Sequence, residues 1–368
     1  MSRHLIAMVG PSPDGHGGMS SVVANYRAEG MFERCGVVYL SSHVEGSAWM
    51  KLRAALSAWF GLWSLLLRGH VRLVHIHTAS GKSFWRKLPF ATLTLLSGRP
   101  LLMHIHGGEF DRFHAKLGRL GRFVVRTILA RSAAVIVLSR SWIDRLSPIS
   151  PDARWTVVLN PVVVHAAARR DVSVGAPIDV LYLARLERAK GVFELLDAFA
   201  VAVRHVPSLR LVLAGDGDRP AVVERIKALG IVDRVELAGW VVGERKTQLL
   251  DRCAIFVLPS HIEGLPIAML EAMAAYAPVI VSNVGSVPEV LTHGVDGWIV
   301  APGEAAPLAE ALVRLGSDST LRGRLAVAAR AEVERHYAAP RVVARLEALY
   351  EQAVGAVRDS KGGVVGFD

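Results

Sequence analysis

The sequence has few cysteines and few charged residues for its length. Of its 368 residues only two are cysteines, Cys35 and Cys253, which stand far apart and outside any metal-like spacing. This scarcity excludes a disulfide framework and suits the reducing cytoplasm. Charged residues make up 21% and apolar residues 52% of the chain, which excludes an intrinsically disordered protein. This length predicts two domains, each with its own core.

Long apolar runs are also absent. The most apolar stretch, 49–67, contains an uncharged run of only fourteen residues at 54–67, whereas a membrane-spanning helix needs roughly 20. We therefore expect 49–67 to form a helix that is buried in a core or lies at a membrane surface. The N-terminal apolar run is too short for a signal peptide and leads at once into a glycine-rich loop.

Acidic residues are nearly missing from one part of the chain. Between Lys51 and Trp142 there are fifteen Lys and Arg but only two acids, Glu109 and Asp111, a local balance of +13 in a chain of net charge +10. Such a concentration of positive charge predicts a basic face on one domain. Its partner would be anionic, either a membrane surface or a nucleic acid.

Much of this charge lies in the segment 111–131. Its apolar residues recur at three- and four-residue steps, which predicts a helix with an apolar stripe formed by Leu117, Leu120, Val124, Ile128 and Leu129. A basic amphipathic helix is typical of a membrane-surface element, and the alternative is an outer helix packed on a sheet. No nucleic-acid-binding module accompanies the charge, so we expect no nucleic-acid partner.

Glycines follow the first predicted strand, 5–9, and precede a predicted helix at 19–27. A strand, glycines and a helix start can cradle a phosphate, because small residues let the anion approach the helix N-terminus. Gly17 and Gly18 are the candidate contacts, and a simple tight turn is the alternative. The loop lacks the spacing of the dinucleotide fingerprint, which argues against a Rossmann-type oxidoreductase.

The stretch 255–290 is the most informative part of the sequence. It predicts a strand at 255–258, a loop, a helix at 267–275 and a buried strand at 278–281. Glu263 lies in the loop and Glu271 about two turns further on. We expect the backbone N–H groups of Gly264, Leu265 and Ile267 to face a ligand in front of the helix, which suits a hydroxylated, anionic molecule.

A second strand-to-helix loop, 185–191, carries two cations. Arg185 and Lys190 are five residues apart, so both side chains can reach one diphosphate. Arginine can hold it with two parallel hydrogen bonds, while lysine acts as a point charge. The alternative is a surface ion pair between Arg185 and Glu187.

Two predicted strands, 73–77 and 101–106, each end in His-x-His. Alternation along each strand places its two histidines on the same face of a sheet. The four residues are His75, His77, His104 and His106. No Asp, Glu or Cys stands at ligand spacing, so we expect no bound metal.

The segment EGLPIAMLEAMAAYAPVIVSNVGSVPEV, from Glu263 to Val290, resembles the signature of retaining glycosyltransferase family 4. The resemblance implies an α/β protein of the GT-B fold, with two Rossmann-like domains whose parallel sheets face an interdomain cleft. It implies an acceptor-binding domain at 1–161, a linker at 162–176 and a nucleotide-sugar-binding domain at 177–337. A C-terminal helix at 338–357 would cross back to the first domain, and 358–368 would form a flexible tail.

The resemblance also implies roles for particular residues. Arg185 and Lys190 would neutralise the leaving nucleoside diphosphate, Glu263 would bind the donor sugar and Glu271 the ribose. His106 would face the donor sugar, where it would stabilise charge or bind a hydroxyl group. Three further groups of residues would contact the donor. Gly17 and Gly18 would lie over the donor phosphates or the acceptor, and Gly264, Leu265 and Ile267 would present their backbone N–H groups. The nucleobase would be bound by Gly239, Trp240 and Val241.

One position departs from the family pattern: Tyr276 stands where relatives often have glycine, and we expect it to alter only the packing. No metal or other cofactor is implied. The implied reaction is transfer of a hexose, such as mannose or glucose, from a nucleoside-diphosphate sugar to a hydroxyl group of a membrane-linked glycan. A polyprenyl-diphosphate-linked acceptor would explain the basic, apolar first domain.

The resemblance places the protein in bacterial exopolysaccharide synthesis. It would be cytoplasmic and peripherally attached to the inner face of the membrane through 111–131 and 49–67. Two alternatives remain at this point. One is a non-catalytic nucleotide-sugar-binding subunit, and the other is a GT-B epimerase that acts on a nucleotide sugar without an acceptor.

Overall fold

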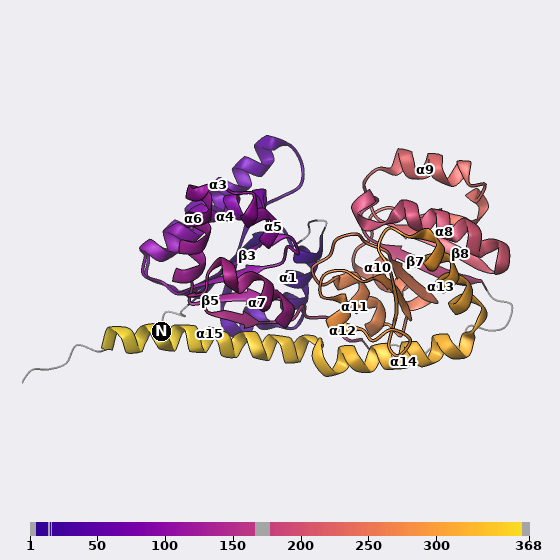
Figure 1. Cartoon of the computed structure of the whole chain (residues 1–368). Helices are drawn as coiled ribbons and strands as arrows, with labels where there is room; N and C mark the ends of the chain where they lie inside the picture. The colour runs from indigo at the N-terminus through magenta and orange to yellow at the C-terminus, as the bar shows by residue number, and fades with distance from the viewer. Residues whose placement is uncertain (1–4, 14, 16, 166–176, 363–368) are drawn as a thin grey trace, which may run out of the picture. The chain divides into compact units, whose positions relative to one another are not determined.

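The computed structural model describes residues 5–13, 15, 17–165 and 177–362. The chain divides into two compact units, the first formed by Met1–Pro161 with Ala339–Asp368 and the second by Val162–Ala338 (Figure 1). Residues 166–176 of the predicted linker, 162–176, and residues 363–368 of the predicted tail, 358–368, lie outside the described residues.

The first unit is built on a six-stranded parallel sheet in the order β2-β1-β3-β4-β5-β6. Its inner strands are almost entirely buried, because helices cover both faces and leave no polar side to the sheet. The strands are β1 (Leu5–Pro11), β2 (Val37–His43), β3 (Val71–Thr78), β4 (Leu101–Ile105), β5 (Ala134–Val137) and β6 (Trp155–Val157).

Helices alternate with these strands along the chain, and a long helix from the chain's end completes the unit. They are α1 (Gly18–Ala28), α2 (Met31–Cys35), α3 (Ala48–Leu67), α4 (Lys82–Leu96), α5 (Phe110–Ala115), α6 (Arg119–Arg131), α7 (Arg140–Leu146), the short η1 (Ser147–Ile149) and α15 (Ala339–Gly362). The structure extends α15 beyond residue 357, where we predicted its end.

The second unit repeats the plan with a six-stranded parallel sheet in the order β12-β11-β10-β7-β8-β9. Its strands are β7 (Ile178–Leu183), β8 (Leu209–Ala214), β9 (Val235–Leu237), β10 (Ile255–Leu258), β11 (Val279–Ser282) and β12 (Trp298–Val300). Its helices are η2 (Arg188–Lys190), α8 (Val192–His205), α9 (Arg219–Ala228), η3 (Val232–Arg234), α10 (Gly243–Arg252), α11 (Ile267–Ala274), α12 (Val287–Val290), α13 (Ala305–Ser317) and α14 (Ser319–His336).

The prediction of two Rossmann-like domains with parallel sheets is therefore confirmed. In each sheet the strand order reverses once, between β1 and β3 in the first unit and between β7 and β10 in the second. Ligands of open α/β sheets bind outside the carboxyl ends of the strands at this reversal. The loops after these four strands are the places to look for a site.

Two expectations about the first unit need correction. The 49–67 stretch does form one helix, α3, but it is not a core helix: only Ala58 and Leu62 are buried, and its large side chains are mostly exposed. The 111–131 segment is not one helix, because the chain breaks between α5 and α6 near Gly118. The buried side of α6 consists of Val125, Ile128 and Leu129, whereas Leu120 of the predicted stripe is exposed.

No helix in the described part of the chain is both long enough and apolar enough to cross a membrane. Helix α3 has 20 residues and exposes most of its large apolar side chains.

Candidate active site

The strongest cluster of candidate residues lies in the second unit, where the loops after β7 and β10 meet. These two strands are hydrogen-bonded neighbours on either side of the reversal in strand order. The loop after β7 carries Arg185 and Lys190, and the loop after β10 carries Glu263. The sequence motifs, although more than 70 residues apart, thus share one edge of one sheet.

Lys190 and Glu263 form a close ion pair. The Nζ atom of Lys190 lies 2.7 Å from Oε1 of Glu263, and the hydroxyl group of Ser260 donates to the same oxygen at 2.7 Å. The Glu263 side chain is only 12% exposed, and Ser260 is fully buried. A carboxylate held by a cation and a hydroxyl group has a fixed direction, which suits recognition of a polar ligand.

Backbone packing joins the two loops that carry this pair. The N–H group of His261 donates to the carbonyl oxygen of Ala189 at 3.0 Å. Gly191 has φ 70° and lies so close to Pro259 that a side chain there would overlap its carbonyl group. The buried hydroxyl group of Tyr182 donates to the carbonyl oxygen of Arg185 at 2.7 Å. The position of Lys190 is therefore set by the backbone around it.

Arg185 forms an ion pair with Glu187, which is the alternative to a contact with diphosphate. Its Nη2 atom lies 2.8 Å from Oε1 of Glu187, and its side chain is 51% exposed. An exposed pair of this kind contributes little stability, so the guanidinium group can exchange its partner for a diphosphate at small cost. Within the described contacts, Arg185 and Lys190 do not touch each other.

Glu271 has a partner that sequence reasoning missed. Lys246 of α10 places its Nζ atom 2.7 Å from Oε1 of Glu271 on α11, and the two side chains are 24% and 11% exposed. Glu263 and Glu271, the two carboxylates that we expect to bind the donor, are thus each paired with one lysine. No sequence signal marked Lys246, because it belongs to a charged helix with no motif of its own.

The remaining predicted donor contacts of this unit fall into two groups. Leu265 and Ile267 are buried beside Gly264 at the start of α11. Gly239 and Trp240 are partly exposed in the loop after β9, whereas Val241 is buried. Of the three expected nucleobase contacts, Gly239 and Trp240 are thus partly open to solvent, and Val241 is not.

In the first unit, Gly17 and Gly18 lie at the N-terminus of α1, in the loop that follows β1. Gly17 precedes the helix and Gly18 is its first residue. A side-chain atom at either position would meet no neighbour within 4 Å among the described atoms. Part of the loop, Asp14 and His16, lies outside the described residues.

The four histidines of the His-x-His motifs form one cluster on neighbouring strands β3 and β4. Three are fully buried, His75, His77 and His104, while His106, just after β4, is partly exposed. His77 Nδ1 lies 2.8 Å from His106 Nε2. Burial lowers the pKa of His106 to about 3, so its imidazole is neutral at physiological pH. Of its two expected roles, hydrogen bonding to a hydroxyl group is the one a neutral ring can perform.

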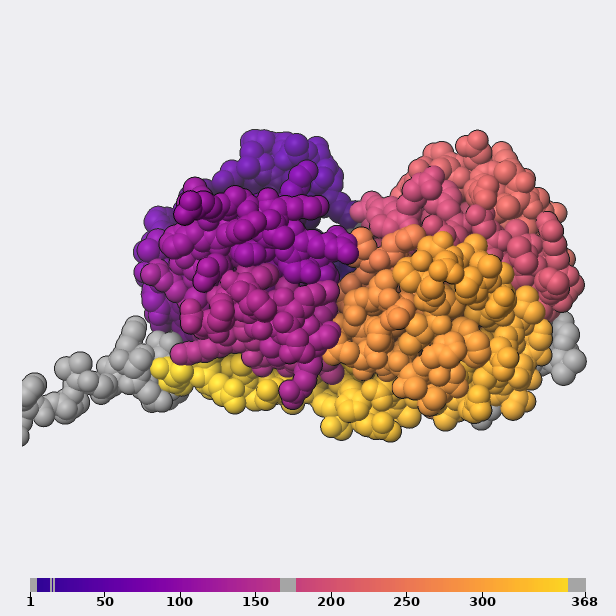
Figure 2. Space-filling model, in the orientation of Figure 1, coloured from indigo at the N-terminus to yellow at the C-terminus, as the bar shows by residue number. Residues whose placement is uncertain are grey.

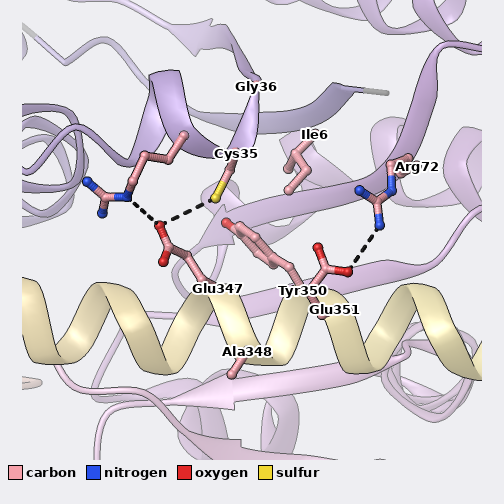
Figure 3. Close-up of a pocket in the computed structure, with 9 residues that line it drawn as sticks. Ile6, Cys35, Gly36, Arg72, Glu347, Ala348, Tyr350 and Glu351 are labelled. Atoms are coloured by element: carbon pink, nitrogen blue, oxygen red, sulfur yellow. Dashed lines mark hydrogen bonds and ion pairs between the residues drawn. The ribbon is translucent and has the colours of Figure 1, made fainter. Parts of the chain in front are cut away.

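A separate polar pocket lies in the first unit between α15 and the amino ends of the sheet (Figure 3). Glu347 accepts hydrogen bonds from Arg34 Nε at 3.1 Å and from the Cys35 thiol, and Arg72 bonds Glu351 at 3.2 Å. Tyr350 also lines it and reaches His75 Nδ1 at 2.7 Å. These contacts fasten α15 to the sheet, and their ion pairs line the pocket.

Comparison with known proteins agrees with this geometry. Residues 14–161 match the family described as glycosyl transferase 4-like domain, and residues 168–332 match glycosyl transferases group 1. Together the two matches cover most of the chain. The chain therefore belongs to the group 1 glycosyltransferases with a 4-like first domain, and the resemblance seen in the sequence is confirmed.

One relative is the amylovoran biosynthesis glycosyltransferase AmsK of Erwinia amylovora. It is 29% identical over 256 residues, which make up 67% of this chain and 62% of that protein. The chain thus matches less than two thirds of the length of this relative.

Two solved structures show a similar fold. Sucrose-phosphate synthase of Thermosynechococcus elongatus has a TM-score of 0.77 at 20% identity and covers 96% of this chain and 100% of its own. HepE of Anabaena, in complex with UDP-glucose, has a TM-score of 0.72 at 18% identity and covers 98% of this chain and 100% of its own. At these identities the likeness establishes the fold, and the GT-B prediction is confirmed.

Proposed function

We propose that the protein is a retaining glycosyltransferase that moves a hexose from a nucleoside-diphosphate sugar to a hydroxyl group of a membrane-linked glycan in bacterial polysaccharide synthesis. The observation that carries the proposal is the Lys190–Glu263–Ser260 cluster at the reversal of strand order. The chain belongs to a glycosyltransferase family. A second lysine–carboxylate pair, at Glu271, lies in the same unit.

The roles of the cationic side chains follow from where negative charge develops during sugar transfer. The bond between the anomeric carbon and the diphosphate oxygen breaks, and negative charge accumulates on the diphosphate. Arg185 and Lys190 stabilise it, as fixed cations do most effectively when they are already positioned. A bond forms from the acceptor oxygen to the anomeric carbon on the same face, and the acceptor proton passes to the leaving diphosphate.

The other residues bind the donor. Glu263 accepts hydrogen bonds from the sugar hydroxyls, Glu271 from the ribose, and neutral His106 bonds a sugar hydroxyl group. Gly17 and Gly18 give the donor phosphates or the acceptor access to the start of α1. We propose that the diphosphate is neutralised by side chains and backbone N–H groups, with no metal in the transfer step.

The donor site is tested first by thermal unfolding with UDP, GDP and ADP. A nucleotide at 100 times its dissociation constant stabilises the native state by about 2.7 kcal/mol. We expect one nucleotide to raise the melting temperature of the wild type and of Lys227→Ala, an exposed lysine of α9, but not of Lys190→Ala. Equal shifts in all three proteins would contradict the proposed diphosphate site.

Turnover is tested with the corresponding sugar donors, and UDP-glucose comes first because HepE of Anabaena was solved with it. We expect a glycosylated lipid-linked product whose anomeric configuration matches the donor, as read by NMR. Inversion would contradict the retaining mechanism. Donor conversion without any acceptor would instead identify an epimerase, and binding without turnover a non-catalytic subunit.

Membrane attachment is proposed from the exposed apolar side chains of the first unit. On α3 the exposed residues include Trp49, Phe60, Trp63 and Leu67, and on α6 they include Leu120 and Phe123. Exposed basic side chains lie on both helices, Lys51 and Arg53 on α3 and four arginines on α6. The start of α3 projects from the surface of this unit (Figure 2). Apolar insertion together with attraction to anionic lipid is how peripheral proteins bind membranes.

Vesicle co-sedimentation tests this attachment. We expect binding to phosphatidylglycerol vesicles that weakens with salt, and little binding to phosphatidylcholine. The double variant Phe60→Ser with Trp63→Ser is expected to bind several-fold more weakly, while Val232→Ser, an exposed apolar residue of the second unit, is expected to bind as the wild type. Equal binding of both variants would overturn the assignment of α3 to the membrane surface.

A further inference from the structure

The histidine cluster of the first unit has a geometry that the sequence did not reveal. His77 and His104 are register partners on adjacent parallel strands, and His75 lies two residues before His77 on the same face. Nitrogen atoms of these three rings all lie within 4.8 Å of one another. Two histidines from one strand and one from its neighbour therefore lie near enough for small movements of the rings to place them around one ion.

We propose that His75, His77 and His104 form a zinc site. Zinc is the metal that best fits three neutral imidazoles with a fourth position for water or another small ligand. With zinc–nitrogen bonds of about 2.0–2.1 Å, two ligand atoms on a tetrahedral ion are roughly 3.3 Å apart. His75 Nε2 and His104 Nδ1 are 3.2 Å apart, close to that separation.

The third ligand atom is Nε2 of His77. This atom is buried and has no hydrogen-bond partner in the described structure. Leaving a buried polar atom unpaired costs about 1–3 kcal/mol, so an unpartnered nitrogen beside two other converging imidazoles requires an explanation. A metal ion supplies the missing partner.

Neighbouring groups hold two of the three ligand rings in suitable tautomers. When His75 donates its Nδ1–H to the Tyr350 hydroxyl oxygen, at 2.7 Å, its Nε2 carries no proton and accepts a hydrogen bond from His104 Nδ1; the metal would take the place of that proton. When His77 donates its Nδ1–H to His106 Nε2, at 2.8 Å, its Nε2 likewise carries no proton. Such outer hydrogen bonds orient metal-binding histidines in known sites. Tyr350 and His106 would therefore be positioning residues of the zinc site.

The three proposed ligands are not among the residues that we propose to contact the donor, although His77 hydrogen-bonds His106, which is. Its ligands come from the two central strands, and Tyr350 comes from α15 at the end of the chain. Bound zinc would join these elements beneath His106. It would thus stabilise the first unit and fix the orientation of His106 through His77.

The test is metal content of the full-length protein. The protein is expressed in zinc-supplemented medium, freed of any affinity tag, dialysed against EDTA and analysed by mass spectrometry for metals. We expect about one zinc per chain in the wild type and in His205→Gln, which changes an exposed histidine of α8, and less than a tenth of that in His77→Gln. Wild type without zinc, or His77→Gln with full zinc, would overturn the proposal.

A second measurement covers the case in which His77→Gln does not fold. The wild type is expressed with cobalt in place of zinc, and its visible absorption spectrum is recorded. We expect the intense bands of tetrahedral cobalt. The weak bands of octahedral cobalt would overturn the proposal, because they indicate surface binding.

Discussion

At the scale of single residues, two largely buried carboxylates of the second unit are each paired with one lysine. Glu263 and Glu271 each face a lysine at 2.7 Å, from a different loop or helix. Breaking a buried pair by removing one partner leaves an uncompensated charge. The lysines are therefore part of the fold as well as of the proposed donor site.

The pair between Lys246 and Glu271 gives the first prediction. We expect Lys246→Ala to lower the free energy of unfolding by about 1–3 kcal/mol, because the carboxylate keeps its charge and loses its partner. The double variant with Glu271→Gln is expected to regain part of that loss, since no charge is then left unpaired. Urea unfolding of the wild type, both single variants and the double variant measures the coupling. Strictly additive effects would show that the pair contributes nothing.

Lys87 gives a prediction about pH. It is 2% exposed and hydrogen-bonds Ser42, and burial, with a smaller effect of Arg86, lowers its pKa to about 7. The unfolded chain keeps the proton up to about pH 10. Between these values the unfolded state binds more protons, so stability rises with pH.

We therefore expect Lys87→Met to stabilise the protein at pH 6, by on the order of 2–4 kcal/mol, and to lose this advantage towards pH 10. Lys82→Met, an exposed lysine on the same helix, is the matched control and should show no such trend. Unfolding in urea at several pH values gives the measurement. A constant difference between Lys87→Met and wild type across this range would contradict the lowered pKa.

At the scale of elements, a glycine after β11 controls the loop that carries Glu263. Gly285 has φ 59°, and a Cβ atom there would overlap the carbonyl oxygens of Glu263 and Gly264. The N–H group of Ser286 donates to the Gly264 carbonyl oxygen at 2.8 Å. The turn before α11 is thus shaped by a residue of the next strand-to-helix loop.

We expect Gly285→Ala to destabilise the protein by about 2 kcal/mol or more and to raise the KM for the donor, because the loop must move to admit the methyl group. Gly294→Ala is the control, since Gly294 also has positive φ, 76°, but open space around it. We expect Gly294→Ala to lower the free energy of unfolding by about 1 kcal/mol, from backbone strain alone. Equal effects of the two changes on KM would contradict the role of Gly285.

The sequence predicted the helices and strands more accurately than the contacts between them. Strand–loop–helix patterns placed β10, α11 and β11 closely, because apolar runs and Gly-Pro signals are local. It noted Tyr276 only as a departure, whereas the structure shows φ 57° there, with the guanidinium group of Arg330 over its ring at 4.9 Å. A left-handed backbone explains why glycine suits this position, but the contact with Arg330 depends on the fold.

The same limit applies to the sites. Alternation put two histidines on one face of each strand, but only the strand order makes β3 and β4 neighbours. Lys246 and Ser260 had no motif, so their pairing with the two carboxylates could not be predicted. The break at Gly118 was missed because the apolar spacing continues across it.

At the scale of the whole molecule, the first unit depends on a helix from the far end of the chain. Helix α15 supplies Glu347, Tyr350 and Glu351 to contacts with residues of the first unit. The second unit is continuous in sequence and contains its own sheet. Stability of the two units should therefore respond differently to loss of this helix.

We expect a chain ending at Ala338 to lose or greatly lower the thermal transition of the first unit while the second unit melts as before. Differential scanning calorimetry of this truncation is compared with one that removes only residues 363–368. The shorter truncation should melt as the full chain. Preserved melting of the first unit without α15 would show that the helix is dispensable.

The discontinuity of the first unit also has a consequence for biosynthesis. On the ribosome, residues 1–161 emerge before the whole of 162–338, and α15 emerges only afterwards. At 5–20 residues per second this interval is roughly 10–35 s. Throughout it, the surface of the nascent sheet that Tyr350 will cover has no helix to cover it, so that surface is where a chaperone would act on the growing chain.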